Sequence, residues 1–139
     1  NTPGITLGCM DRVHAMTDVT GFGLLGNLLE ICRASHAAAT IEFARIPLHP
    51  GVLELAREGL VTGASARNWS GYGNDVTLMP GTTDVERALL TDPQTSGGLL
   101  VACAPDAVDE VLALFRNDGF GQAAVIGEIL AGAPRVTVR

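Results

Sequence analysis

The amino-acid sequence predicts an α+β fold, with helices packed on a mixed sheet of about four or more strands. Stretches with apolar residues at helical spacing alternate with short apolar runs that are typical of strands. The connections near the end of the chain are short, which permits antiparallel pairing beside parallel pairing. Seventeen glycines are too many for a plain helical bundle and indicate several tight turns.

The apolar pattern places the expected elements along the chain. The clearest helix is 105–117, because Pro105 suits the first helical position and apolar residues line one side. Residues 59–74 hold four glycines and are expected to form a long loop. The other expected helices are 21–35, 49–58 and 84–90, and the expected strands are 13–16, 39–46, 75–79, 99–103, 123–130 and 135–138.

The length and composition indicate one folded domain. The 139 residues suit a single domain, and a content of 47% hydrophobic and 17% charged residues disfavours disorder. Residues 1–12 lack periodicity, so we expect a linker or disordered start there and the domain itself over 13–139. No apolar run reaches about 18 residues, so we expect no membrane partner.

The charged residues and cysteines narrow the function classes. The net charge is −6 and all nine basic residues are arginine, which excludes a Schiff-base lysine or a Walker-type lysine in this chain. The arginines form no basic stripe, so nucleic acid is not an expected partner. Three cysteines lie far apart without a C-x-x-C pair, which disfavours disulfides and zinc and indicates a reducing, cytoplasmic location.

The stretch 21–26 reads G-x-G-x-x-G between an expected strand and an expected helix. With Glu42 at the end of the next strand, it makes most of a dinucleotide-binding fingerprint. The carboxylate of Asp18 would repel a pyrophosphate, however, unless a cation lay between them. Two other interpretations are open: Asp18 and Thr20 cap the helix, or Asp18 takes part in a metal–phosphate site, which we favour.

Two longer stretches carry a family resemblance. Residues 14–30 (HAMTDVTGFGLLGNLLE) and residues 92–100 (DPQTSGGLL) resemble signature motifs of the selenophosphate synthetases. The segment 46–56 and the late strand 124–129 resemble the same family. The resemblance therefore covers about residues 13 to 139.

The resemblance implies the carboxy-terminal α+β domain found in the group that includes aminoimidazole ribonucleotide synthetase. It also implies a transferase, or kinase, that converts ATP, selenide and water to selenophosphate, phosphate and AMP. The family's reactive Cys or selenocysteine, its essential Lys and most of its metal-binding Asp residues lie in an amino-terminal domain that binds nucleotide and dimerises. We therefore expect no catalytic residue in this chain and no activity of the chain alone. Its expected partner is its own amino-terminal domain, within a homodimer.

One ligand of that family maps onto this chain. The resemblance implies that Asp18, in TDVTGFG, coordinates Mg²⁺ beside the phosphates of ATP. Mg²⁺ prefers hard oxygen ligands and commonly takes one or two carboxylates plus substrate phosphates. Thr17, Thr20 and the helix start at Gly21 are candidates for hydroxyl and N–H contacts to the phosphates. The alternative for both threonines is local capping only.

The DPQTSGG stretch offers a second group of candidates. Thr95 and Ser96 precede Gly97, and glycine lets a backbone come close to an anion. The alternative is a structural loop in which Asp92 caps its own turn. Either interpretation fits a turn that leads into the strand at 99–103.

Three alternatives for the whole chain stay open at this point. The first is an interaction module of the same fold without a part in catalysis. The second is the equivalent domain of a sister ATP-using enzyme, against which the DPQTSGG stretch argues. The third, which we favour least, is a dinucleotide-binding module built on the glycines of 21–26.

Overall fold

The computed structural model, which describes residues 1–139, has six α-helices and six strands interspersed along the chain. The fold is α+β, as the sequence predicted. The helices are α1 (Gly4–Leu7), α2 (Gly23–Ser35), α3 (Val52–Arg57), α4 (Gly63–Tyr72), α5 (Asp84–Leu90) and α6 (Val108–Asn117). The strands are β1 (Val13–Asp18), β2 (Ala37–Ile41), β3 (Val76–Leu78), β4 (Leu99–Cys103), β5 (Gly127–Ala131) and β6 (Arg135–Val138).

The strands form two separate sheets. The larger is four-stranded in the order β3-β6-β2-β5, with β6 parallel to both β3 and β2 and with β5 antiparallel to β2. It is therefore the mixed sheet that the sequence predicted. The smaller is an antiparallel ribbon of β1 and β4, in which Asp18 lies opposite Leu99. This register brings the end of β1 to the start of β4.

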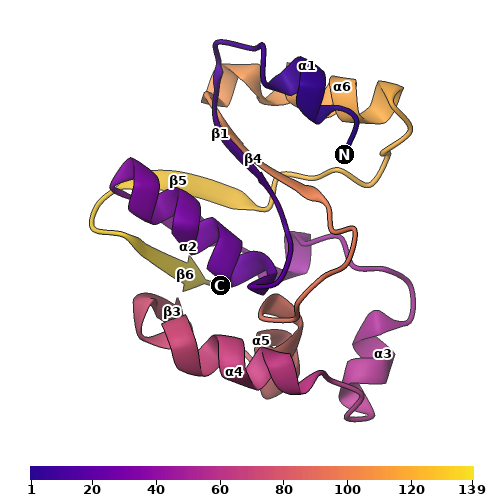
Figure 1. Ribbon diagram of the computed structural model, residues 1–139, viewed down its shortest axis with the longest axis vertical. Coiled ribbons are helices and arrows are strands. Elements are labelled where there is room, and N and C mark those ends of the chain that lie inside the picture. Colours follow the sequence, from indigo (N-terminus) through magenta and orange to yellow (C-terminus); the bar gives the residue numbers. More distant parts are fainter.

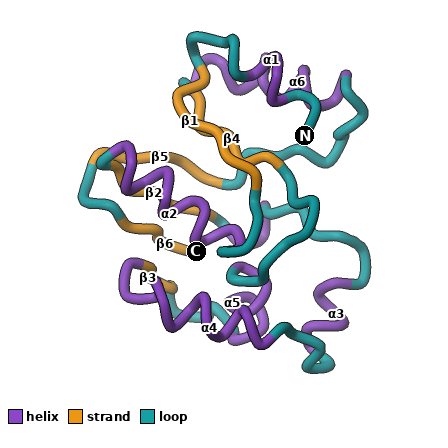
Figure 2. Tube along the Cα trace, in the orientation of Figure 1, coloured by secondary structure: helices purple, strands orange, loops and turns teal.

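The ribbon links two parts of the molecule. Figure 1 shows β1 and β4 running from α1 and α6 at one end toward the start of α2, with α3, α4 and α5 at the opposite end. Figure 2 shows a long connection before α3, a shorter one between α3 and α4, and a loop between α5 and β4. The stretches that carry the two motifs thus meet near the middle of the molecule.

Helix α2 supplies more of the core than any other element. Its apolar residues recur at helical spacing, and Leu25, Leu29 and Cys32 are fully buried. They pack in one cluster with Val136 and Val138 of β6, which are also fully buried. The helix ends at a left-handed residue, His36, after which β2 begins. The motif at the start of α2 is therefore anchored directly to the centre of the fold.

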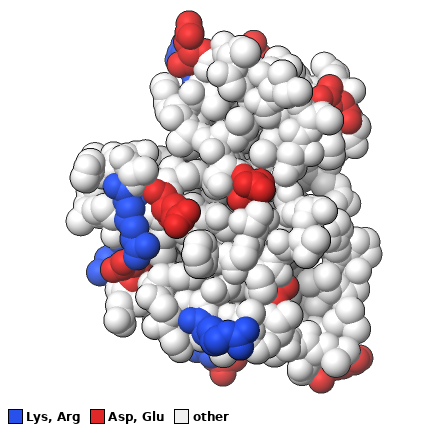
Figure 3. Space-filling view, in the orientation of Figure 1, with Lys and Arg blue, Asp and Glu red and all other residues white.

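Packing is looser between the ribbon and the large sheet. An apolar cavity of about 560 Å³ lies there, and it is lined mainly by α2, β2, β4, α6, β5 and the segment before β5. Charged side chains are scattered over the face seen in Figure 3, and large areas of it carry none. None of the helices combines the length and apolar character needed to cross a membrane.

The prediction of a long loop at 59–74 is wrong, because α4 occupies most of this stretch. Thr62 caps this helix by accepting a hydrogen bond from the backbone N–H of Ser65, and Gly73 is its carboxyl cap. Gly63 and Gly73 thus flank the helix, whereas the sequence suggested that such glycines interrupt one. A helix is also present at Gly4–Leu7, where no regular element was expected, and Leu7 is fully buried.

Other boundaries were predicted with mixed success. Helix α5 and strands β4 and β6 span the residues that the sequence indicated. Strand β2 ends at Ile41 and not at residue 46, because the backbone N–H of Phe43 donates to Arg139 and turns the chain around the end of β6. Strand β5 begins at Gly127, four residues after the expected start.

The buried face of α2 gives a test of the core. Replacing Leu29 with alanine should lower the free energy of unfolding by about 2–5 kcal/mol, because a fully buried side chain is lost and a cavity remains. The matched control is Leu60→Ala, since Leu60 is 66% exposed and should change it by less than about 0.5 kcal/mol. Urea unfolding of the chain measures both, and equal effects would contradict the placement of α2.

Candidate functional site

Two loops meet at the end of the β1/β4 ribbon. The TDVTGFG loop (residues 17–23) leaves β1, and the DPQTSGG loop (residues 92–98) leads into β4. The backbone N–H of Val19 donates to the carbonyl of Gly98 at 2.9 Å, and the N–H of Gln94 donates to the carbonyl of Thr20 at 3.0 Å. The two motifs that the sequence singled out are therefore one structural unit.

Gly97 makes the close approach of these loops possible. A Cβ at this position would overlap the carbonyl oxygen of Val19, whereas a Cβ at Gly98 would meet nothing within 4 Å. The carbonyl of Gly97 also accepts a hydrogen bond from the side-chain amide of Asn1 at 3.1 Å. Glycine at position 97 is thus explained by contact with protein.

Asp18 lies at the end of β1 with its side chain exposed. It takes part in none of the four ion pairs of the molecule, and its carboxylate accepts none of the side-chain hydrogen bonds. No group of three or more His, Cys, Asp or Glu side chains could hold a metal ion. Asp18 therefore fits a magnesium site as a single free ligand, and the remaining oxygens would come from outside this chain.

The hydroxyl candidates lie on the two joined loops, and they differ in whether their hydroxyls are already bonded. The hydroxyl of Thr17 donates to the backbone carbonyl of Asp18 at 3.1 Å, while Thr20, Thr95 and Ser96 are exposed. Ser96 has a φ of 55°, the left-handed region. No side chain caps the amino end of α2, so the interpretation of Asp18 and Thr20 as helix caps is wrong.

The glycines of the G-x-G-x-x-G stretch face protein, apart from the first. A Cβ at Gly23 would lie 2.6 Å from the backbone of Thr91, and one at Gly26 would lie 2.8 Å from the ring of Tyr72. Gly21 has open space at the same position. Moreover, β1 and β2 lie in different sheets, so the parallel strand pair of a dinucleotide-binding unit is absent. The structure therefore does not support the dinucleotide interpretation.

Helix α4 contributes residues that the sequence interpretation missed. The amide nitrogen of Asn68 donates to the carbonyls of Gly21 and Thr91, each at 2.9 Å. Asp92 accepts hydrogen bonds from the hydroxyls of Thr62 at 2.9 Å and Ser65 at 3.2 Å, so its role as cap of its own turn is wrong. The spacing of the polar residues along 62–72 was the available signal, but the glycines of this stretch obscured it.

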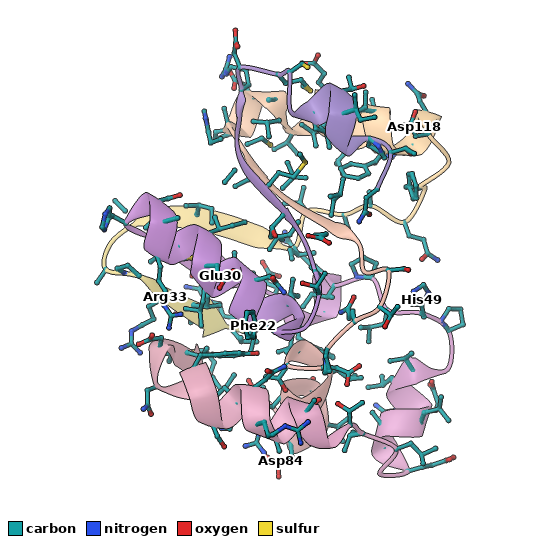
Figure 4. The ribbon with its side chains drawn as sticks, in the orientation of Figure 1. Phe22, Glu30, Arg33, His49, Asp84 and Asp118 are labelled. Atoms are coloured by element: carbon teal, nitrogen blue, oxygen red, sulfur yellow. The ribbon has the colours of Figure 1, made fainter.

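Phe22 stands at the start of α2, above α4 in Figure 4. The residue is 52% exposed. Its carbonyl accepts a hydrogen bond from the hydroxyl of Tyr72 at 2.5 Å. His49 lies on the loop before α3, away from Phe22 in the same view.

A family model described as AIR synthase related protein, C-terminal domain, matches residues 5–139. This chain belongs to that family. The α+β fold described above is therefore that of an AIR synthase related domain. Its mixed sheet and its two joined loops both lie within the matched residues.

Relatives named selenide, water dikinase match this domain along almost its whole length. The protein from Paraburkholderia xenovorans (strain LB400) is 57% identical over 138 residues, which is 99% of this chain and 39% of that protein. The protein from Dechloromonas aromatica (strain RCB) is 52% identical, with 99% and 40% covered. The one from Rhizobium meliloti (strain 1021) is 46% identical with the same shares. The chain thus spans about two fifths of these relatives and matches their carboxy-terminal part.

Solved structures share the fold of this domain. E. coli HypE, a hydrogenase maturation protein, aligns with a TM-score of 0.64 at 20% identity, over 99% of this chain and 34% of that one. A structure of HypE in complex with ATP aligns with a TM-score of 0.58 at 19% identity, over 91% and 32%. At such identities the likeness shows the fold alone.

Two of the three cysteines of this AIR synthase related domain are poor nucleophiles. Burial raises the pKa of the Cys32 thiol, and burial together with the charge of Asp106 raises the pKa of the Cys103 thiol. A thiol with a raised pKa is mostly protonated at neutral pH. Neither side chain is therefore suited to nucleophilic attack.

The contact between the loops predicts opposite behaviour of adjacent glycines. Gly97→Ala should lower the free energy of unfolding by about 1–3 kcal/mol, because the new methyl group forces the DPQTSGG loop away from Val19. Gly98→Ala is the matched control, and there the methyl group points into open space. Urea unfolding of both variants measures this difference, and a Gly98→Ala variant as unstable as Gly97→Ala would contradict the contact.

The buried phenol predicts a loss of stability at high pH. Burial raises the pKa of Tyr72 to about 12, with a smaller opposing effect of the Gly26 backbone N–H. The folded state thus favours the protonated phenol, and this stability is complete below about pH 10, the usual pKa, and lost as pH rises toward 12. Tyr72 is the single tyrosine, so phenolate absorbance reports it alone. Tyr72→Phe should lack this contribution, and a phenolate midpoint near the usual value of about 10 would contradict the burial.

Proposed function

We propose that this chain is the carboxy-terminal domain of an ATP-dependent selenophosphate synthetase. In this reaction ATP, selenide and water are converted to selenophosphate, phosphate and AMP. The relatives named selenide, water dikinase support the proposal, as does the meeting in space of the two motifs that resemble the selenophosphate synthetases. Because the chain spans about two fifths of those relatives, the activity belongs in this proposal to a longer protein.

The observation that carries the proposal is the free carboxylate of Asp18. It is exposed, unpaired and placed where the TDVTGFG and DPQTSGG loops join. We propose that it is one ligand of a Mg²⁺ ion that also contacts the phosphates of ATP. An exposed carboxylate without a partner in the fold has its oxygen lone pairs available for such an ion.

The chain's own groups have distinct parts in the proposed site. When bound, Mg²⁺ would neutralise phosphate charge and so assist phosphoryl transfer. Asp18 would supply a charged oxygen from a strand end that is fixed by pairing with β4. Groups of the two loops would orient phosphate oxygens or water; they are the exposed Thr20, Gly21, Thr95 and Ser96 and the half-buried Thr17 and Gly97.

The rest of the site is proposed to lie in a preceding domain. This chain has no lysine and no metal-binding cluster of its own, so the other cations and carboxylates must come from elsewhere. We propose an amino-terminal domain of the same protein as the partner, forming a homodimer in the cytoplasm. The division of this chain into a linker at 1–12 and a domain at 13–139 stays a prediction.

The test of this function is Asp18→Asn in the full-length protein. Selenide-dependent turnover of ATP should fall roughly 100-fold or more, because the neutral amide is a weaker magnesium ligand and stabilises less phosphate charge. Thermal unfolding should be nearly unchanged, since the side chain has no partner in the fold.

The matched control is Asp118→Asn. Asp118 is exposed and follows α6, at the end of the molecule away from Phe22 and the two loops (Figure 4). Its substitution should leave turnover near normal. A near-normal rate for Asp18→Asn would remove Asp18 from the site. The lack of any selenide-dependent turnover in the full-length protein would favour the alternative of an interaction module.

A further inference from the structure

One face of α4 is directed at both motif loops. Its polar residues Thr62, Ser65, Asn68 and Tyr72 are three, three and four positions apart, the spacing of a single helix face. Thr62 and Ser65 bond to Asp92, and Tyr72 bonds to the carbonyl of Phe22. Each of these three side chains therefore reaches one loop only.

Asn68 is different because a single amide nitrogen reaches both stretches. It donates to the carbonyl of Gly21, in the turn that follows Asp18, at 2.9 Å. It also donates to the carbonyl of Thr91, at the entrance of the DPQTSGG loop, at 2.9 Å. No other side-chain hydrogen bond in the molecule joins these two segments through one atom.

The orientation of this amide follows from its partners. Both acceptors are backbone carbonyl oxygens, so the amide nitrogen and not the amide oxygen must face them. Both N–H groups of the nitrogen are thereby used. A side chain without two donors would leave at least one of the two carbonyls without this partner.

The two hydrogen bonds of Asn68, to Gly21 and Thr91, are called the clamp below. The position of Gly21 connects this clamp to Asp18. Gly21 lies three residues after Asp18, and the intervening Thr20 carbonyl accepts from both Gly23 and Gln94 at 3.0 Å. On its other side, Asp18 is held by the pairing of β1 with β4. Strand pairing thus holds the backbone of Asp18 and of the residues before it, and Asn68 holds the turn that follows.

We propose that Asn68 is a positioning residue for the Asp18 carboxylate. It holds the turn of the TDVTGFG loop against the end of α5, and so sets the direction in which the carboxylate meets a shared magnesium ion. This proposal rests on the function proposed above for Asp18. Loss of the clamp should weaken metal binding more than it weakens the fold.

The first test uses the magnesium dependence of ATP turnover in the full-length protein. Asn68→Ala should raise the Mg²⁺ concentration needed for half-maximal rate by about tenfold, the usual effect of losing a group that orients a metal ligand. The matched control is Ser65→Ala, which removes the hydroxyl's hydrogen bonds to Asp92 and Thr62 and none to the TDVTGFG loop. It should leave the magnesium dependence near that of the unchanged protein.

A double variant separates positioning from stability. If Asn68 acts through Asp18, then Asn68→Ala should add no further change in magnesium dependence to a protein that already carries Asp18→Asn. A purely structural role would give the same additional change in either background. Should the alanine variant fail to fold, Asn68→Ser keeps one donor and should show an intermediate rise.

A second readout needs no activity. Amide hydrogen exchange measured on peptides that cover residues 17–23 of the full-length protein should be faster in Asn68→Ala and unchanged in Ser65→Ala. Unchanged exchange in the alanine variant would overturn the clamp.

The outcomes distinguish the two proposals. If Asp18→Asn alters magnesium dependence and Asn68→Ala does not, the positioning role of Asn68 is overturned while the proposed function stands. If Asp18→Asn itself has no effect, the proposed function fails, whatever the exchange experiment shows of the clamp.

Discussion

The contact between Gly97 and the carbonyl of Val19 is the constraint on which the site depends. It lets the DPQTSGG loop lie directly against the TDVTGFG loop, where two backbone hydrogen bonds, Val19 to Gly98 and Gln94 to Thr20, then join them. Any side chain at position 97 would separate the loops. The end of β1, and with it Asp18, is consequently presented on a rigid edge and not on a free loop.

The sequence predicted the class of fold and the elements with strong periodicity. Helix α5 and strands β4 and β6 matched, because their apolar residues point to one packed core and clear turn residues bound them. Helix α4 was missed because glycine is a poor helix former, and the sequence does not show that Gly63 and Gly73 lie at its ends. Its tertiary role was equally hidden, since the carbonyls that Asn68 bonds belong to residues 47 and 23 positions away.

The glycine pattern at 21–26 shows why a motif alone decides little. The spacing of these glycines suggested a dinucleotide-binding turn. In the structure, however, a side chain at Gly23 would clash with the backbone of Thr91, and one at Gly26 would clash with the ring of Tyr72. The resemblance of 14–30 and 92–100 to a family proved more informative, because two motifs distant in sequence turned out to be in contact. In the proposed function, the same close packing that excludes a dinucleotide presents a single carboxylate to a partner domain.

The most direct test of the account is the position of the metal in the full-length protein. A crystal structure with Mn²⁺ in place of Mg²⁺ and a non-hydrolysable ATP analogue would locate the ion by its anomalous scattering. The account predicts an Asp18 carboxylate oxygen at roughly 2.0–2.3 Å from an ion that also contacts the phosphates. An ordered ion on the phosphates with Asp18 turned away into solvent would contradict it.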